Sequence, residues 1–84
     1  MKAETKEMID SMINTLTVTI LIGLRSKDFI IDQLNQENGG IYGDEIAVIA
    51  DVQAGTYNNK EYTEDFGKAF LFVKNRVKWA INKI

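Results

Sequence analysis

Residues 63–84 form the most strongly periodic segment of the chain. Their apolar side chains recur every three or four residues and, at 100° per residue, fall within about 100° of one another. Thr63 suits an N-cap, and Glu64 and Asp65 in the first turn match the helix dipole. The pattern predicts an amphipathic helix over 64–83 whose apolar stripe packs against a hydrophobic core. The stripe consists of Phe66, Phe70, Val73, Val77, Ala80, Ile81 and Ile84.

Three further segments, at about 4–24, 27–37 and 44–54, have helical spacing and are separated by turn residues. Ser26 suits the N-cap of the second, and Gly55 ends the third. The 84 residues are 45% hydrophobic, which predicts a single domain, 1–84, with a small core. We expect a compact all-α bundle of about four helices, with the long first and last helices antiparallel and the short ones closing one end.

An α+β fold is the alternative. Residues 15–24 alternate between Thr and larger apolar side chains, and residues 46–57 can be drawn as a hairpin, so strands are possible near both segments. If residues 15–24 are helical instead, Val18, Leu21 and Ile22 lie outside the main apolar stripe. Because the core is small, we expect burial of this surface in a homodimer or higher oligomer.

The composition excludes several classes of site. Without His or Cys, the chain has no usual zinc site, no disulfide and no imidazole-assisted nucleophile. We expect no enzyme, no cofactor and no metal, and we interpret Asp28 and Asp32 as a solvated acidic face. The glycines at 39–43 precede Asp44 and Glu45, which would repel a phosphate, so they predict a turn.

The longest apolar run, residues 16–24, is far shorter than the roughly 20 residues of a membrane span. The first 12 residues carry charges where a signal peptide needs an apolar segment. We therefore expect a cytoplasmic protein with no membrane span.

One face of the last helix combines aromatic and basic side chains. Phe72 and Trp79 are seven residues apart and point well over 100° away from the centre of the core stripe. Such a face suits an acidic protein partner or an anionic ligand. The competing interpretation is that the first helix covers both rings. The candidate binding residues are Lys68, Phe72, Arg76, Trp79 and Lys83.

Charge is distributed unevenly along the chain. Residues 66–84 carry five basic groups and no acidic group, whereas residues 1–65 carry five basic and twelve acidic groups. The net charge of −2 therefore hides a dipolar chain, which favours a charged partner or head-to-tail association.

Residues 45–57 read Glu-Ile-Ala-Val-Ile-Ala-Asp-Val-Gln-Ala-Gly-Thr-Tyr. The Ile-Ala pair, the Ala three residues on, the Val after the turn position and the Gly-Thr-Tyr run resemble the helix-turn-helix of bacterial and phage repressors. Asp51 stands where that family has the turn Gly, and Lys60 where it has an apolar residue. The resemblance implies a DNA-binding transcriptional regulator, the alternative function. By this resemblance Gln53 and Thr56 would face the major groove, and the alternative DNA-binding site would consist of Gln53, Thr56 and Tyr57.

Residues 44–65 hold six acids against one Lys, which argues against phosphate contacts. We therefore expect a small non-enzymatic binding or inhibitor protein that acts through the basic-aromatic face. The Asn-, Lys- and Ile-rich composition is typical of regulators and inhibitors encoded by phages and other mobile elements.

Overall fold

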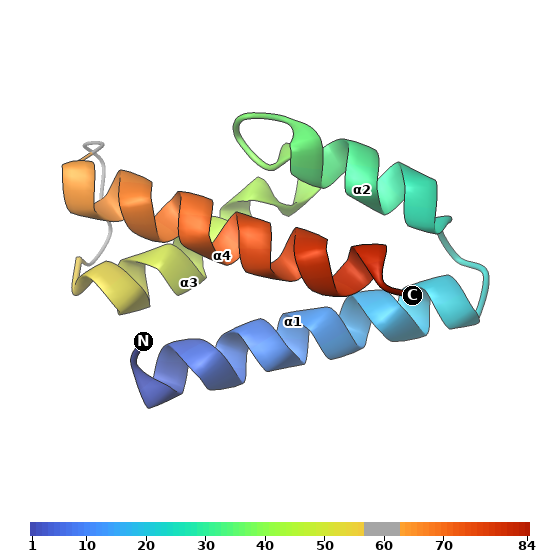
Figure 1. The fold of residues 1–84 in the computed structure, drawn as a ribbon, viewed down its shortest axis with the longest axis horizontal. Helices are drawn as coiled ribbons and strands as arrows, with labels where there is room; N and C mark the ends of the chain where they lie inside the picture. Colours follow the sequence, from blue (N-terminus) through green and yellow to red (C-terminus); the bar gives the residue numbers. More distant parts are fainter. Residues whose placement is uncertain (57–62) are drawn as a thin grey trace.

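The computed structural model describes residues 1–56 and 63–84, and these fold into four α-helices and one short 3-10 turn (Figure 1). No strand occurs in these two ranges, so the all-α prediction is confirmed and the α+β alternative is wrong for 15–24 and 46–56; residue 57 lies outside them. The elements are α1 (Ala3–Leu21), α2 (Lys27–Asn35), η1 (Gly40–Tyr42), α3 (Gly43–Ala54) and α4 (Glu64–Asn82).

Threonines in the second half of α1 fit the helix because their hydroxyls bond back to it. The Thr17 hydroxyl donates to the Ile13 carbonyl at 2.7 Å, and the Thr19 hydroxyl donates to the Thr15 carbonyl at 2.8 Å. This arrangement accommodates the β-branched residues that suggested a strand. The helix ends three residues earlier than expected, and Gly23 in the turn after it adopts a positive φ of 74°.

The predicted N-caps of α2 and α4 and the predicted C-cap of α3 are confirmed, whereas α2 ends at Asn35 with Gln36 as its C-cap and not at Asn38-Gly39, as its spacing predicts. The Ser26 hydroxyl accepts a hydrogen bond from the Phe29 N–H at 3.1 Å, and the Thr63 hydroxyl accepts one from the Phe66 N–H at 3.1 Å. Gly55 ends α3 in the left-handed conformation, with φ of 74°.

The helix α4 packs against the other three helices and most extensively against α3. It runs in the same direction as α1 (Figure 1). At one end, Met1, just before α1, and Lys68, near the start of α4, line the same hollow. At the other end, Lys27, in the segment after α1, donates hydrogen bonds to Asn82 O and Ile84 O at the end of α4. The prediction that the two long helices are antiparallel is therefore wrong. The cause is that α2 and α3 follow each other along α4 in one direction, so the chain reverses only twice between α1 and α4.

A close-packed turn carries the chain from α2 into α3. A Cβ atom on Gly43 would collide with the Asn38 carbonyl oxygen, and one on Gly40 would collide with the Gln33 side-chain oxygen. Gly39 and Gly40 also have positive φ values of 81° and 59°. The predicted turn role of these glycines is confirmed, since only Gly fits both requirements.

The core receives side chains from all four helices. Its fully buried members lie on the apolar stripes of the helices, and in α4 they occupy the middle of the predicted stripe. Phe66 and Phe70 of that stripe are half-buried, and Ile84 is exposed. The buried cluster consists of Ile9, Met12, Leu16, Ile30, Leu34, Ile46, Ile49, Val73, Val77 and Ile81.

Lysine side chains bind the carbonyl oxygens at the ends of three helices. None of the four α-helices has a basic residue in its own last turn, so the cations come from elsewhere in the chain. The Lys2 ammonium donates to Val52 O at 2.9 Å, and the Lys74 ammonium donates to Gln36 O at 3.1 Å. The Lys27 ammonium donates to Asn82 O at 2.9 Å and Ile84 O at 2.7 Å. These bonds complement the negative ends of α3, α2 and α4 and join neighbouring helices.

Candidate functional site

All five predicted binding residues are exposed: four lie on α4, and Lys83 directly follows its last residue. Phe72 is 41% exposed and Trp79 is 55% exposed, although α1 packs against the same helix. The interpretation that α1 covers both rings is therefore wrong. The reason lies in helix geometry, because α1, α2 and α3 together enclose Val73, Val77 and Ile81 and leave the outer side of α4 open.

Arg76, Trp79 and Lys83 form the tightest part of this surface, which we call the Trp79 cluster. The Lys83 ammonium lies 3.5 Å from the centre of a Trp79 ring, and the Arg76 guanidinium carbon lies 5.6 Å from it. In the described ranges no carboxylate lies within 4.0 Å of either cation. The indole holds both cations in place without neutralising them, so the cluster keeps a positive potential beside an exposed apolar ring.

Lys68 and Phe72 lie nearer the start of α4 and have other neighbours. The Lys68 ammonium pairs with the Glu64 carboxylate at 3.0 Å, and both side chains are mostly exposed. Phe72 lines a hollow with Met1 and Gln53. The structure therefore brings together three of the five predicted residues, and it places the other two on the same helix with separate contacts.

A second hollow, of about 560 Å³, lies between α2 and α4 and opens beside the Trp79 cluster. Three asparagines on its wall supply amide donors and acceptors next to the indole. Sequence reasoning missed this hollow because it depends on how α2 packs on α4. The residues that line it are Ile31, Asn35, Asn75, Lys78, Trp79 and Asn82.

The residues of the alternative DNA-binding site do not have the arrangement that a helix-turn-helix would give them. Helix α3 continues through Asp51, where the resemblance places the turn. The Gln53 side-chain oxygen accepts the Lys2 backbone N–H at 3.1 Å, and the Thr56 hydroxyl donates to the Asp51 carboxylate at 2.7 Å. Tyr57 lies outside the described residues. The expected turn is absent from residues 43–54, and Gln53 and Thr56 are bonded within the protein.

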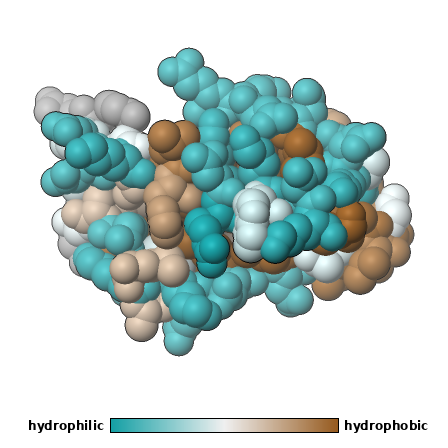
Figure 2. Space-filling model, viewed as in Figure 1, coloured by the Kyte–Doolittle hydropathy of each residue, from teal (hydrophilic) through white to brown (hydrophobic). Residues whose placement is uncertain are grey.

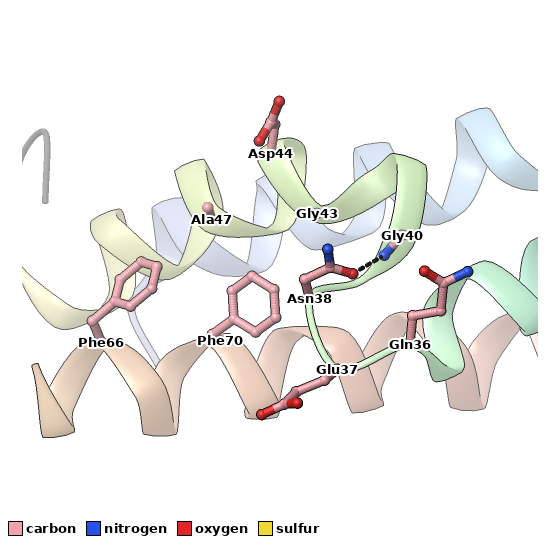
Figure 3. Close-up of a pocket in the computed structure, with 9 residues that line it drawn as sticks. All are labelled: Gln36, Glu37, Asn38, Gly40, Gly43, Asp44, Ala47, Phe66 and Phe70. Carbon is pink, nitrogen blue, oxygen red and sulfur yellow. Dashed lines mark hydrogen bonds between the residues drawn. The ribbon is translucent and has the colours of Figure 1, made fainter. Parts of the chain in front are cut away.

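A third hollow lies where α3 and the 36–40 turn meet the first half of α4 (Figure 3). Its volume is about 700 Å³. The Phe66 and Phe70 rings project into it from α4, with centroids 6.0 Å apart and planes tilted by 42°. Sequence reasoning treated both rings as core and the glycines of the turn only as turn formers. No signal in the sequence shows that the 36–40 turn and the first half of α4 lie close enough to enclose a hollow.

Large aliphatic side chains gather at the C-terminal end of α1, which we call the α1 tip. Val18, Leu21, Ile22 and Leu24 are exposed, Leu21 by 73%, and Figure 2 shows an apolar area over this end of the molecule. Residues 14–24 carry no charged side chain. The α1 tip is therefore an uncharged apolar surface, of the kind that partners cover.

The described residues contain no helix that is long and apolar enough to cross a membrane. Among the same residues, no group of three or more Asp or Glu side chains is placed to hold a metal ion, and Asp28 and Asp32 are exposed. Comparison with protein-family models, curated proteins and solved structures found no match. The function is therefore argued from the geometry of this chain.

Proposed function

We propose that this is a small, non-enzymatic protein that binds an acidic protein surface through the Trp79 cluster. The observation that carries the proposal is the exposed Trp79 ring, which two cations contact and no carboxylate neutralises within the described ranges. Trp and Arg are the residue types most enriched at the energetic centres of protein interfaces. Binding without catalysis is how small inhibitors and regulators act.

The charges of the last helix support an acidic partner. Of the five basic groups in 66–84, Lys68 pairs with Glu64 and Lys74 is bound to a backbone carbonyl. Arg76, Lys78 and Lys83 have no carboxylate within 4.0 Å in the described part of the chain. Because a partner's carboxylates would meet cations that need not first break an ion pair, association gains in rate and specificity.

An anionic small molecule is a second candidate because of the hollow beside the cluster. Lys78 and the asparagines could bind an anionic group there while Trp79 stacks on its apolar part. A protein partner is better supported, since Arg76 and Lys83 are exposed and are not among the residues that line the hollow.

We also propose that the α1 tip joins copies of the chain in a homodimer or higher oligomer. Two copies of an uncharged surface can meet without like-charge repulsion, and burial of Leu21 and Leu24 would add apolar contact to a small core. Sedimentation velocity over a range of concentrations tests this. Leu21→Glu should shift the protein to monomer, whereas Val48→Glu, on the exposed side of α3, should not.

The binding proposal is tested by photo-crosslinking in cells of the source organism. A photoreactive phenylalanine analogue replaces Trp79, or Val48 as a matched exposed control. We expect position 79 to crosslink to one acidic protein, position 48 to give no such product, and Arg76→Gln together with Lys83→Gln to reduce the yield. Equal products from both positions would overturn the proposal.

The DNA-binding alternative predicts a different result. A gel-shift series with duplex DNA over increasing salt should show steep loss of affinity if phosphates are neutralised. We expect no binding at low salt, because Gln53 and Thr56 are bonded within the protein and α3 begins with two acids. Binding that Gln53→Ala abolishes would favour the regulator.

A further inference from the structure

We propose that the side-chain amide of Asn38 is a site of spontaneous deamidation and that Lys74 controls how fast it reacts. Asparagine is a chemically labile residue, and Asn38 is both exposed and the only asparagine in the chain that a glycine follows. A glycine at the next position leaves the reaction unhindered, because it has no Cβ. The site is separate from the Trp79 cluster, since Lys74 lies on the buried side of α4.

The reaction needs only water and the chain itself. The backbone nitrogen of Gly39 loses its proton and forms a bond to Cγ of Asn38. The Cγ–Nδ2 bond then breaks, so that ammonia leaves and a cyclic imide remains. Water opens the imide at either of its two carbonyls. The product is an aspartate in a normal backbone or an isoaspartate, whose main chain passes through the former side-chain carbons.

The turn polarises the amide that is attacked. The Gly40 N–H donates a hydrogen bond of 2.9 Å to the Asn38 side-chain oxygen (Figure 3). Negative charge develops on that oxygen when the Gly39 nitrogen adds to the amide carbon. A donor that is already in place stabilises this charge, as the donors of an oxyanion hole do. The Asn38 amide is therefore activated in the folded protein.

The turn protects the nitrogen that attacks. Gly39 is buried, and its N–H donates to the Gln36 carbonyl at 2.9 Å. A buried, hydrogen-bonded amide loses its proton only when the structure opens locally, as in hydrogen exchange. The Lys74 ammonium donates to the same Gln36 carbonyl at 3.1 Å, and Lys74 is only 8% exposed. Lys74 thus fixes the carbonyl that keeps the Gly39 nitrogen unreactive.

The reaction damages the junction between α2 and α3. A Cβ on Gly43 would collide with the Asn38 carbonyl oxygen, so the Asn38 backbone is packed closely against the start of α3. An isoaspartate adds a methylene group to the main chain at this point, which the close packing cannot accommodate. Replacing Gly39 would not remove the hazard without strain, because its φ is 81° and a Cβ would lie 3.0 Å from the Gly43 Cα.

The test is peptide mapping by mass spectrometry of the whole protein during incubation at mildly alkaline pH. Lys74→Met should deamidate at Asn38 about fivefold to thirtyfold faster than the unaltered protein, because the turn opens more often. Lys78→Met, one helical turn away, should react at the unaltered rate. Ile81→Val, which removes a methylene group from the core without touching the turn, should change the rate by less than about twofold.

Two further measurements need no destabilised variant. The unaltered protein should deamidate at Asn38 at least about tenfold more slowly when folded than in urea, and its Gly39 amide should show slow hydrogen exchange by NMR. Lys74→Arg, which keeps a cationic donor, should react like the unaltered protein.

Equal rates in the folded and the urea-unfolded protein would overturn the proposal. So would equal acceleration in Lys74→Met and Ile81→Val, because the reaction would then require global unfolding and not local opening of the turn. A slower reaction in Lys74→Met would also overturn it, since the Lys74 charge would then promote loss of the Gly39 proton.

Discussion

The inner and outer faces of α4 both carry large apolar and basic side chains, but those on the inner face are buried in the fold and those on the outer face are exposed to solvent. On the inner face Ile81 is fully buried, and the ammonium of Lys74, a residue only 8% exposed, is bound to a backbone carbonyl. On the outer face Trp79 is 55% exposed, and two cations lie against its ring, with no ion pair to either of them among residues 1–56 and 63–84. The comparison shows that a side chain's type does not decide its role: its neighbours determine whether it stabilises the fold or remains available to a partner.

The largest expected effect comes from truncating an inner-face side chain. Ile81→Ala should lower the free energy of unfolding by about 3 kcal/mol, because it leaves a cavity in a core to which all four helices contribute. Leu71→Ala, at a position 54% exposed on the same helix, should change it by less than about 0.5 kcal/mol. Urea denaturation followed by circular dichroism measures both. Similar losses in the two variants would contradict the division into faces.

The next largest effect is the difference in stability between variants of Lys74 and Lys78, which are one helical turn apart. Lys74→Met should destabilise the protein by about 1–2 kcal/mol, because it removes a charge-assisted hydrogen bond at the C-terminal end of α2. Lys78→Met serves as the control, since no hydrogen bond or ion pair fixes Lys78 in the described part of the chain. Thermal denaturation of the two variants should show a lower melting temperature for Lys74→Met alone. A stabilised Lys74→Met protein would mean that burial of the ammonium costs more than its bond contributes.

The smallest effect concerns the outer face itself. A double-mutant cycle between Trp79→Leu and Lys83→Met should give a coupling free energy of about 0.5 kcal/mol, typical of an exposed cation–ring contact. Chemical denaturation of the four proteins measures it. A coupling above about 2 kcal/mol would make the Trp79 cluster a structural element rather than a surface available to a partner.

Sequence reasoning predicted the elements whose causes are local. Ser26, Thr63 and Gly55 cap their helices because each cap depends only on neighbouring residues, and the α4 stripe follows from its own spacing. The prediction for the direction of α1 relative to α4 is wrong, because that direction depends on α2 and α3 following each other along α4, which no local pattern in the sequence shows.

The candidate site was predictable only in part. The five residues of the basic-aromatic face follow from the helical spacing, but their exposure depends on where three other helices pack. Nothing in the sequence shows that Lys74 has a structural role and Lys78 does not, because the carbonyl that binds Lys74 belongs to Gln36, 38 residues away. The hollow lined by Phe66 and Phe70 likewise depends on the position of α3 relative to α4.

The most direct test of the central claim is the fluorescence of Trp79, the only tryptophan in the chain, during titration with a polyglutamate peptide at low salt. The account predicts the red-shifted emission of a water-exposed indole in the free protein and a saturable change on adding polyglutamate. That change should be absent with polylysine and weakened in Arg76→Gln and Lys83→Gln. Emission typical of a buried indole, or the same response to both peptides, would contradict the claim that the Trp79 cluster binds an acidic partner.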